Sequence, residues 1–188
     1  RLSIYRSVLT PAPGLDLGPV LELARTCDAV VLDIADYARR LIPLLGVAGI
    51  AFWSDLHDWD GMQEHHRDFA AAARTLVLSA DALADPGPLC RSLSGQGRLV
   101  VCTDGPRRAT AYVGERVLTV PVEPVREVVD TNGAGDAFVA GLLHGSLLGW
   151  PLARSLRAGA VAGATAVGVD GLADLRLTAA VLERATAG

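Results

Sequence analysis

The stretch VVDTNGAGDAFVAGLLHGSLLGW, residues 128–150, joins a β-branched run to a glycine-rich turn and a predicted helix. Asp130 follows the run, Gly133 and Gly135 form the turn, and Asp136 lies in the first turn of the helix. Glycines allow tight backbone geometry and close approach of a ligand. The first N–H groups of a helix lack intrahelical acceptors, and the positive end of its dipole points the same way. The stretch therefore predicts an anion site, most obviously for phosphate.

Asp136, beside that anion site, has two interpretations. Its carboxylate would repel phosphate, but it could accept a proton from a hydroxyl that attacks phosphorus, as a kinase base does. Equally, acids in the first turn of a helix are common because they stabilise the dipole, and a glycine-rich turn can be only a turn. The stretch is neither a Walker loop, since no Lys follows the glycines, nor a dinucleotide fingerprint, since Phe138 replaces the third glycine. The residues alone leave both interpretations open.

Composition and charge exclude several classes of protein. The chain has 188 residues, of which 51% are hydrophobic, and a formal net charge of −4. This composition is typical of a globular protein and leaves no basic surface for nucleic acid. The longest uncharged stretch, residues 137–153, contains a histidine, several glycines and a proline, so we interpret it as a helix and a turn and expect no membrane span. We expect one α/β domain over residues 1–188.

Three cysteines, Cys27, Cys90 and Cys102, are odd in number and share no metal-ligand spacing. Cys102 lies in the apolar run RLVVCTDG, where a small buried thiol is the ordinary explanation. We expect no secretory signal at the start of the chain. We therefore expect a reduced, cytoplasmic protein.

Short apolar runs alternate with helix-like stretches along the first half of the chain. We expect strands at residues 29–34, 47–53, 76–80 and 98–103, and helices at residues 17–26, 35–45, 63–75 and 89–93. Buried runs separated by helices predict a parallel sheet that is covered on both faces. The start at Arg1 also looks extended, as a strand would be.

The pattern changes in the second half. ATAYVGERVLTVPV, residues 109–122, has a Gly-Glu turn between two extended arms and predicts a hairpin at the sheet edge. EVVDT, residues 127–131, predicts a further strand, whose end would place the glycine turn at the carboxyl edge of the sheet, where open α/β sheets bind ligands. Helices are predicted for the rest, with Gly149 ending one, Pro151 opening the next and Thr178 capping the last.

DTNGAGDAFVAG, residues 130–141, resembles the second signature of the ribokinase/PfkB carbohydrate-kinase family, whose usual form is D-T-x-G-A-G-D-x-F. The resemblance extends from the strand at Ala29 to Gly171. It implies a ribokinase-like three-layer α/β/α fold with a mostly parallel sheet and an edge hairpin. It also implies that Asp136 is the catalytic base, which meets the substrate hydroxyl. The family's anion hole falls on the backbone amides of Gly133, Ala134 and Gly135.

The same resemblance implies where nucleotide and cations would bind. CTDG, residues 102–105, resembles the family's T-x-G nucleotide loop. Residues implied near ATP are Thr103, Asp104, Gly105, Ser79 and Ala160. A monovalent cation, with K⁺ as the candidate ion, would be held by Asp130, the carbonyl of Asn132, and the turn from Val169 to Gly171. ATP would arrive with Mg²⁺.

Several positions depart from the family pattern. Arg108 stands where the T-x-G-x-x-G loop ends in glycine, so that loop's backbone must differ. Ser79 and Ala82 replace the Asn and Glu of the family element that organises magnesium-bound water and phosphate. We therefore expect the coordination of magnesium to differ from that in the family. Ala160 replaces a polar residue often found near the adenine.

The family's N-terminal strands, Gly-Gly sugar-binding motif and lid have no counterpart in this sequence. The abrupt start at Arg1 leads us to expect a C-terminal portion of a longer protein. Without a lid to exclude water, we expect the 188 residues alone to be inactive or very weak. The family often forms homodimers through the lid, so the resemblance implies that the full-length protein is a homodimer.

The resemblance thus implies an ATP-dependent sugar kinase that transfers the γ-phosphoryl group to a sugar hydroxyl. Its partners would be ATP and a small sugar, with no nucleic acid and no membrane. Two alternatives stay open. One is a nucleoside kinase of the same family, whose acceptor is a ribonucleoside 5′-hydroxyl. The other is a non-catalytic member that binds nucleotide or a protein partner, which the changes at Ser79, Ala82 and Arg108 favour and Asp136 opposes.

SDLHDWDGMQEHHRD, residues 54–68, gathers acids and histidines that could form a metal site. His65 and His66 are adjacent and would point to different faces of a helix, and no His-x-x-x-His pair is present, so a polar loop leading into a helix is the better interpretation. The resemblance implies that Asp55 and His57 lie near the cleft. We expect Trp53 and Trp59 to be packing residues.

Overall fold

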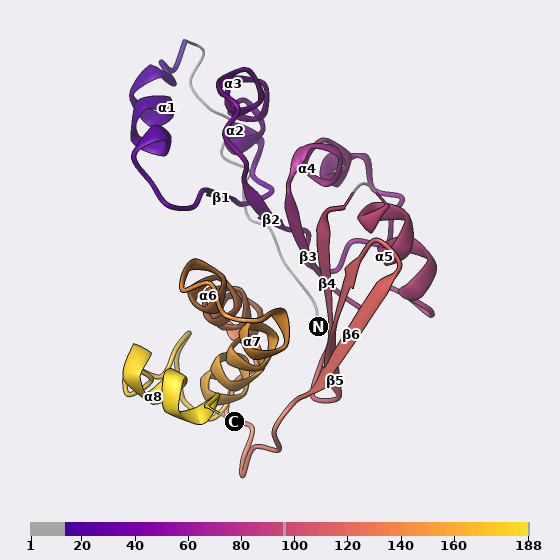
Figure 1. Ribbon diagram of the computed structural model, residues 1–188, viewed down its shortest axis with the longest axis vertical. Coiled ribbons are helices and arrows are strands. Elements are labelled where there is room, and N and C mark those ends of the chain that lie inside the picture. Colours follow the sequence, from indigo (N-terminus) through magenta and orange to yellow (C-terminus); the bar gives the residue numbers. More distant parts are fainter. Residues whose placement is uncertain (1–13, 96, 188) are drawn as a thin grey trace.

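The computed structural model describes residues 14–95 and 97–187, whose strands form one sheet in the order β1-β2-β3-β4-β5-β6 (Figure 1). The strands are β1 Val31–Leu32, β2 Trp53–Asp55, β3 Thr75–Ser79, β4 Leu99–Asp104, β5 Arg108–Val113 and β6 Arg116–Pro121. Strands β1 to β4 pair in parallel, whereas β4, β5 and β6 pair antiparallel. The predicted mostly parallel sheet with an edge hairpin is confirmed.

Helices cover both faces of this sheet. The first half of the chain contains α1 Gly18–Arg25, α2 Asp36–Arg39, α3 Ile42–Ala48, the 3-10 helix η1 Glu64–His66, α4 Arg67–Ala72 and α5 Gly87–Ser94. Because right-handed crossovers join neighbouring parallel strands, the helices between β1 and β4 lie on one face. The second half contributes α6 Ala134–Leu147, α7 Leu152–Ala166 and α8 Ala179–Ala185, and α6 and α7 cover the other face (Figure 1). The three-layer α/β/α fold is therefore confirmed.

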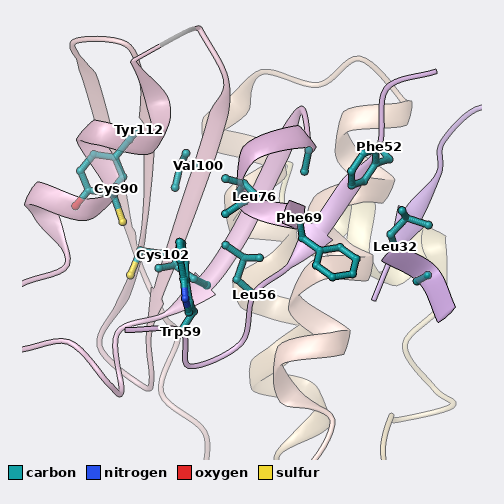
Figure 2. Packing of buried hydrophobic residues seen from close by; sticks show 14 of the residues in the cluster. Leu32, Phe52, Leu56, Trp59, Phe69, Leu76, Cys90, Val100, Cys102 and Tyr112 are labelled. Carbon is teal, nitrogen blue, oxygen red and sulfur yellow. The ribbon is translucent and has the colours of Figure 1, made fainter. Parts of the chain in front are cut away.

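The two cores follow from the alternation of side chains along the central strands. Leu76 and Leu78 of β3 pack with Val100 of β4 in the cluster beneath α3, α4 and α5 (Figure 2). The intervening Val77 and Val101 point the other way, into the cluster with α6 and α7. Successive strand residues face opposite sides of a sheet, so a strand buried on both faces needs an unbroken apolar run. Trp59 is buried in the first cluster, as expected of a packing residue.

Small residues let α6 and α7 pack closely. A Cβ built on Gly141 would lie 2.5 Å from the carbonyl oxygen of Ala158, and one built on Gly163 would lie 3.0 Å from that of Ala134. The first contact is too close for any residue larger than glycine without a shift of the backbone, and the second would require Ala134 to move by a few tenths of an ångström. This packing fixes where the first turn of α6 lies relative to α7.

The strand expected at residues 47–53 is wrong in its position. Pro43 lies in the first turn of α3, and the helix runs on through Val47 to Ala48. Gly49 then takes a left-handed conformation with φ of 68°, and the Ile50 N–H donates to Leu45 across the helix end. The apolar run thus spans a helix terminus as well as the approach to a strand, which begins only at Trp53. A left-handed glycine that closes a helix explains the difference.

The strand expected at residues 127–131 is also wrong, because no strand is assigned there in the described chain. The N–H groups of Val129 and Asp130 both donate to the carbonyl of Val167 at the end of α7, over 2.8 and 3.3 Å. Val128 and Val129 are 58% and 50% exposed. A helix end thus satisfies the backbone that the β-branched run would otherwise have paired in a sheet. Tertiary context overrides β propensity here.

The ends of the helices in the second half of the chain agree better with the boundaries predicted from the sequence. Gly149 follows α6 with φ of 68°, Pro151 precedes α7, and the Thr178 hydroxyl accepts from the Val181 N–H at the start of α8. The helix expected at residues 35–45 is divided into α2 and α3, and that at 63–75 into η1 and α4. The extended start expected at Arg1 lies outside the described residues. Of the helices described, none has the length and apolarity to cross a bilayer.

Candidate functional site

The carboxyl ends of the four parallel strands form one continuous edge. Asp33 follows β1, Asp55 and Ser79 end β2 and β3, and Asp104 ends β4. Two backbone hydrogen bonds join the loops beyond them. The Ser79 N–H donates to the carbonyl of His57 over 2.6 Å, and the Ala80 N–H donates to that of Thr103 over 2.8 Å. Ligands bind at this edge in open α/β sheets.

The first turn of α6 has amide donors that face outward. Gly133 adopts φ of 77°, which favours glycine, and its carbonyl accepts the Ala137 N–H over 2.9 Å. The N–H groups of Gly135 and Asp136 have no backbone acceptor within the part of the chain that the structure describes. A Cβ built on Gly135 would meet nothing within 4 Å. Open space above unpaired amides at a helix N-terminus suits an anion.

Asp136 lies near the carboxyl end of β2. Its side chain is exposed, and its carboxylate lies near enough to act electrostatically on Asp55 and His57. Burial raises the pKa of Asp55 above its ordinary value, the carboxylates of Asp136 and Asp33 add to that rise, and His57 opposes it. The structure thus brings the predicted base, Asp55 and His57 together.

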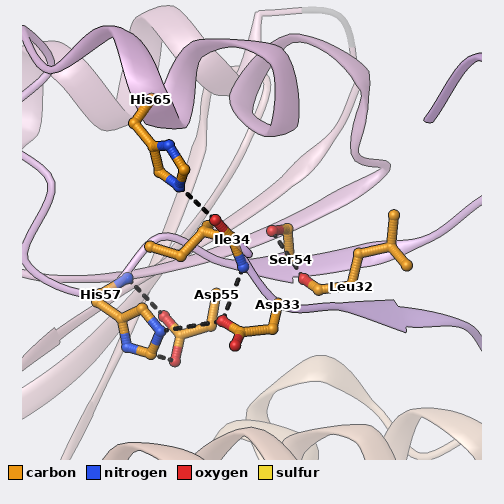
Figure 3. Close-up of polar contacts among 7 residues, drawn as sticks. All are labelled: Leu32, Asp33, Ile34, Ser54, Asp55, His57 and His65. Carbon is orange, nitrogen blue, oxygen red and sulfur yellow. Dashed lines mark hydrogen bonds and ion pairs between the residues drawn. The ribbon is translucent and has the colours of Figure 1, made fainter. Parts of the chain in front are cut away.

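Asp33 is a member of this group that the sequence reasoning missed. His57 Nε2 lies 3.5 Å from Asp33 Oδ1, and His57 Nδ1 lies 3.8 Å from Asp55 Oδ2 (Figure 3). The contact with Asp33 raises the pKa of His57; burial opposes this rise, and Asp55 and Asp136 add to it. One feature of the sequence could have indicated Asp33: it comes directly after an apolar run that predicts a strand. Because the carboxyl ends of parallel strands meet at one edge of the sheet, a residue at that position lies near Asp55.

The loop that resembles a nucleotide loop lies at the end of β4. The Thr103 hydroxyl donates to the carbonyl of Leu78 over 3.4 Å, and Gly105 takes φ of 49°. The Asp104 carboxylate accepts from Arg107 Nε over 2.8 Å and lies 3.4 Å from Arg108 Nε. The hydrogen bond from Arg107 lowers the pKa of Asp104. Two arginines therefore engage this acid, a pairing that the sequence reasoning did not foresee.

Ser79 and Ala82 lie at the end of β3 and in the loop after it. The Ser79 hydroxyl accepts the Asp81 N–H over 3.2 Å, and Ala82 is exposed. Across residues 14–95 and 97–187, no three His, Cys, Asp or Glu residues group so that they could hold a metal ion. A Mg²⁺ ion that enters with ATP would draw most of its ligands from phosphate and water.

Ala160 lines a cleft of about 360 Å³ at the same edge. The cleft lies between the end of β6, residues 123–125 and the face of α7 that carries Val161, Ala164 and Thr165. Because β6 runs parallel to β4, Pro121 lies at the carboxyl edge too. The contact of Gly163 with the start of α6 places this part of α7 beside the glycine turn.

The residues implied in cation binding come from two segments that touch. Asp130 Oδ1 accepts the Asn132 N–H over 2.9 Å, while the Asp130 N–H donates to Val167. A Cβ on Gly133 would lie 2.5 Å from the carbonyl oxygen of Leu172, directly after Gly171. The Val169 N–H donates to Ala166, the last residue of α7, over 3.4 Å.

The histidines of residues 54–68 have separate contacts. His65 Nε2 meets the carbonyl of Ile34, and the His66 ring stacks on Trp59 with ring centroids 6.0 Å apart. The Trp59 indole N–H donates to the carbonyl of Gln63 over 3.0 Å. These contacts are those of a loop packed on a helix. Trp53 is half-buried against the second core cluster.

Comparison with known proteins adds a family and several relatives. Residues 63–179 match the family described as pfkB family carbohydrate kinase. Acarbose 7(IV)-phosphotransferase of an Actinoplanes species is 47% identical over 118 residues, which cover 60% of this chain and 40% of that protein. The solved structure of a microbiome-derived acarbose kinase superposes with a TM-score of 0.79 at 34% identity, covering 89% of this chain and 58% of that one.

A ribokinase of Arabidopsis thaliana, solved with ribose and ATP, superposes with a TM-score of 0.74. Its identity to this chain is 19%, so the likeness concerns the fold alone. The match covers 91% of this chain and 59% of the ribokinase. The chain thus spans less than two thirds of the length of each of these three relatives.

Proposed function

The chain belongs to the pfkB family of carbohydrate kinases, and from that premise we propose that it carries the nucleotide-binding and catalytic part of an ATP-dependent sugar kinase. One observation supports this most strongly. The first turn of α6 presents the amides of Gly135 and Asp136, which have no backbone acceptor in the described chain, and the Asp136 carboxylate lies within electrostatic range of Asp55 and His57 at the strand ends. An anion site with an adjacent acid is what phosphoryl transfer to a hydroxyl requires.

The proposed reaction is transfer of the γ-phosphoryl group of MgATP to a sugar hydroxyl. The acceptor oxygen forms a bond to the γ-phosphorus as the bond to the bridging β–γ oxygen breaks, and ADP leaves. Asp136 takes the proton of the acceptor hydroxyl. The amides of Gly133, Ala134 and Gly135, the anion hole that the family resemblance implies, would stabilise negative charge on the transferring group. Of these, the Gly135 N–H has no backbone acceptor in the described chain, whereas the Ala134 N–H donates to the carbonyl of Thr131 over 3.4 Å. Mg²⁺ enters as part of the nucleotide substrate.

We place the nucleotide across the ends of β4 and α7. The cleft beside Ala160 has a mixed lining that suits a base and ribose, and the glycine turn next to it suits the phosphates. Thr103 and Gly105 would contact the nucleotide chiefly through the backbone, because the Thr103 hydroxyl donates to Leu78 and glycine has no side chain. The carboxylate of Asp104 is engaged by Arg107 and Arg108. Ser79 would border the phosphates, with its hydroxyl held by Asp81.

A monovalent cation, with K⁺ as the candidate, would bind where residues 130–132 meet residues 169–172. The contact between Gly133 and Leu172 supports this placement, because it brings the backbone carbonyl of residue 172 beside the turn that follows Asp130. Carbonyl and carboxylate oxygens suit a hard cation. A cation there would hold the glycine turn in place.

Acarbose is the substrate named for two of the relatives, so we propose a carbohydrate acceptor. The nucleoside kinase and the non-catalytic nucleotide binder are the alternatives. A panel of acceptors separates the first from a sugar kinase, and ATP binding without turnover would identify the second. The chain alone is expected to transfer phosphate weakly or not at all, since it spans 58% of the acarbose kinase structure.

Replacing Ala164 by Glu is expected to raise the KM for ATP about tenfold in the complete protein, with kcat little changed. The longer acidic side chain enters the cleft and weakens ATP binding equally in the ground state and in the transition state. Steady-state kinetics with ATP as the varied substrate measures this. Ala180→Glu in α8 is the matched control, since Ala180 is exposed and does not line the cleft. Equal KM values for the two variants would remove the nucleotide from this cleft.

A further inference from the structure

His57 is the only residue other than glycine with positive φ in the described chain, at 52°. This conformation lets its N–H donate to Asp55 Oδ1 over 2.9 Å while its carbonyl accepts the N–H of Ser79. Left-handed backbone is costly for a residue with a Cβ and persists where the surroundings fix it. The loop after β2 is therefore fixed by contacts to its own strand and to the next one.

This backbone places the imidazole between two carboxylates. His57 Nε2 lies 3.5 Å from Asp33 Oδ1, and Nδ1 lies 3.8 Å from Asp55 Oδ2 (Figure 3). The His57 side chain is 47% exposed, so solvent and ligands reach it. Asp33 after β1 and Asp55 in β2 contact the imidazole of His57, and Asp136 in α6 and His66 in η1 lie within electrostatic range of it.

Three carboxylates at one edge pose a problem for a site that accepts phosphate. Asp33, Asp55 and Asp136 each carry negative charge when ionised, and the triphosphate of ATP carries more. Like charges at close range repel, most strongly where water is excluded. The imidazolium of His57 is the single cation that the structure places in contact with both Asp33 and Asp55 among the described residues.

We propose that His57 is a positioning residue of phosphoryl transfer, whose imidazolium, held between Asp33 and Asp55, offsets the acidic strand ends so that the phosphates can approach the glycine turn. This inference rests on the proposed kinase function. The contact with Asp33 raises the pKa of His57, so the imidazolium persists to higher pH than in a free histidine. As pH rises through that raised pKa the positive charge is lost and the carboxylates repel the phosphates uncompensated.

The test is the pH dependence of phosphoryl transfer by the complete protein, measured beside an NMR titration of its labelled histidines. The rate of phosphoryl transfer by the wild type is expected to fall at alkaline pH. The pH at the midpoint of this fall should equal the pH at which His57 titrates by NMR. His57→Asn tolerates the left-handed backbone, lacks the charge, and should lose about tenfold in rate at neutral pH together with that alkaline fall. Asp33→Asn should move both midpoints to lower pH by about one unit.

Asp58→Asn is the matched control, since it removes a neighbouring exposed carboxylate that makes no described contact with the imidazole. The pH at the midpoint of the alkaline fall in rate should be the same in Asp58→Asn as in the wild type. An alkaline fall that persists unchanged in His57→Asn, or a His57 titration whose midpoint differs from that of the rate, overturns the inference and leaves the kinase function standing. Absence of phosphoryl transfer to any acceptor in the wild type overturns both.

Discussion

Replacing Asp136 by Asn in the complete protein is expected to lower kcat by about 10²- to 10⁴-fold, because the amide cannot accept the proton of the acceptor hydroxyl. ATP binding should change little, since the amides of the glycine turn and the cleft along α7 are untouched. Isothermal titration with ATP and steady-state kinetics with a working acceptor measure the two effects separately.

Asp68→Asn is the control for the competing interpretation of Asp136. Asp68 is also an acid in the first turn of a helix, α4, and its carboxylate lies 3.5 Å from a guanidinium nitrogen of Arg39. If Asp136 only stabilised the helix dipole, both substitutions would cost stability of about 0.3–1 kcal/mol and neither would affect the rate. A large loss of kcat confined to Asp136→Asn identifies it as the base.

Gly133→Ala is expected to abolish most phosphoryl transfer and to lower the free energy of unfolding. The new methyl group costs about 1–2 kcal/mol for the left-handed backbone, and its Cβ would lie 2.5 Å from the Leu172 carbonyl oxygen, which adds strain of about 1–3 kcal/mol. Relief of that contact must move the glycine turn away from residues 171–172. Chemical unfolding gives the stability and kinetics gives the loss of activity.

Gly149→Ala separates the cost of the left-handed backbone from the cost of the contact with Leu172. Gly149 has φ of 68°, close to the 77° of Gly133, and a Cβ there would meet nothing within 4 Å. This variant should show only the backbone cost and keep its activity. Equal loss of stability and full activity in both variants would contradict the claim that the contact with Leu172 fixes the turn.

Local sequence patterns predicted the parts of the fold that depend on local chemistry. The glycine turn and the start of α6 follow from residues within one short stretch, and the β5–β6 hairpin follows from its turn and two extended arms. Boundaries that depend on distant partners were not predictable in this way. The run at residues 127–131 is bound by a helix end from Val167, and nothing in the run itself indicates that partner.

The candidate site shows the same division. The pattern around Asp136 predicted an anion site with an adjacent acid, and the resemblance placed Asp55 and His57 near it. Asp33 escaped notice because its contact with His57 spans 24 residues of sequence and depends on the parallel pairing of β1 with β2. The pairing of Asp104 with Arg107 and Arg108 is local, but no pattern of residue types distinguishes it from ordinary surface charge.

The most direct test of the account is the transfer of phosphate from ATP by the complete protein to a panel of sugars, oligosaccharides and nucleosides, with the phosphorylated product identified by mass spectrometry. We predict one carbohydrate acceptor that is phosphorylated at a hydroxyl with stoichiometric release of ADP. Phosphorylation of nucleosides alone would contradict the sugar acceptor. ATP binding without transfer to any member of the panel would contradict the kinase function itself.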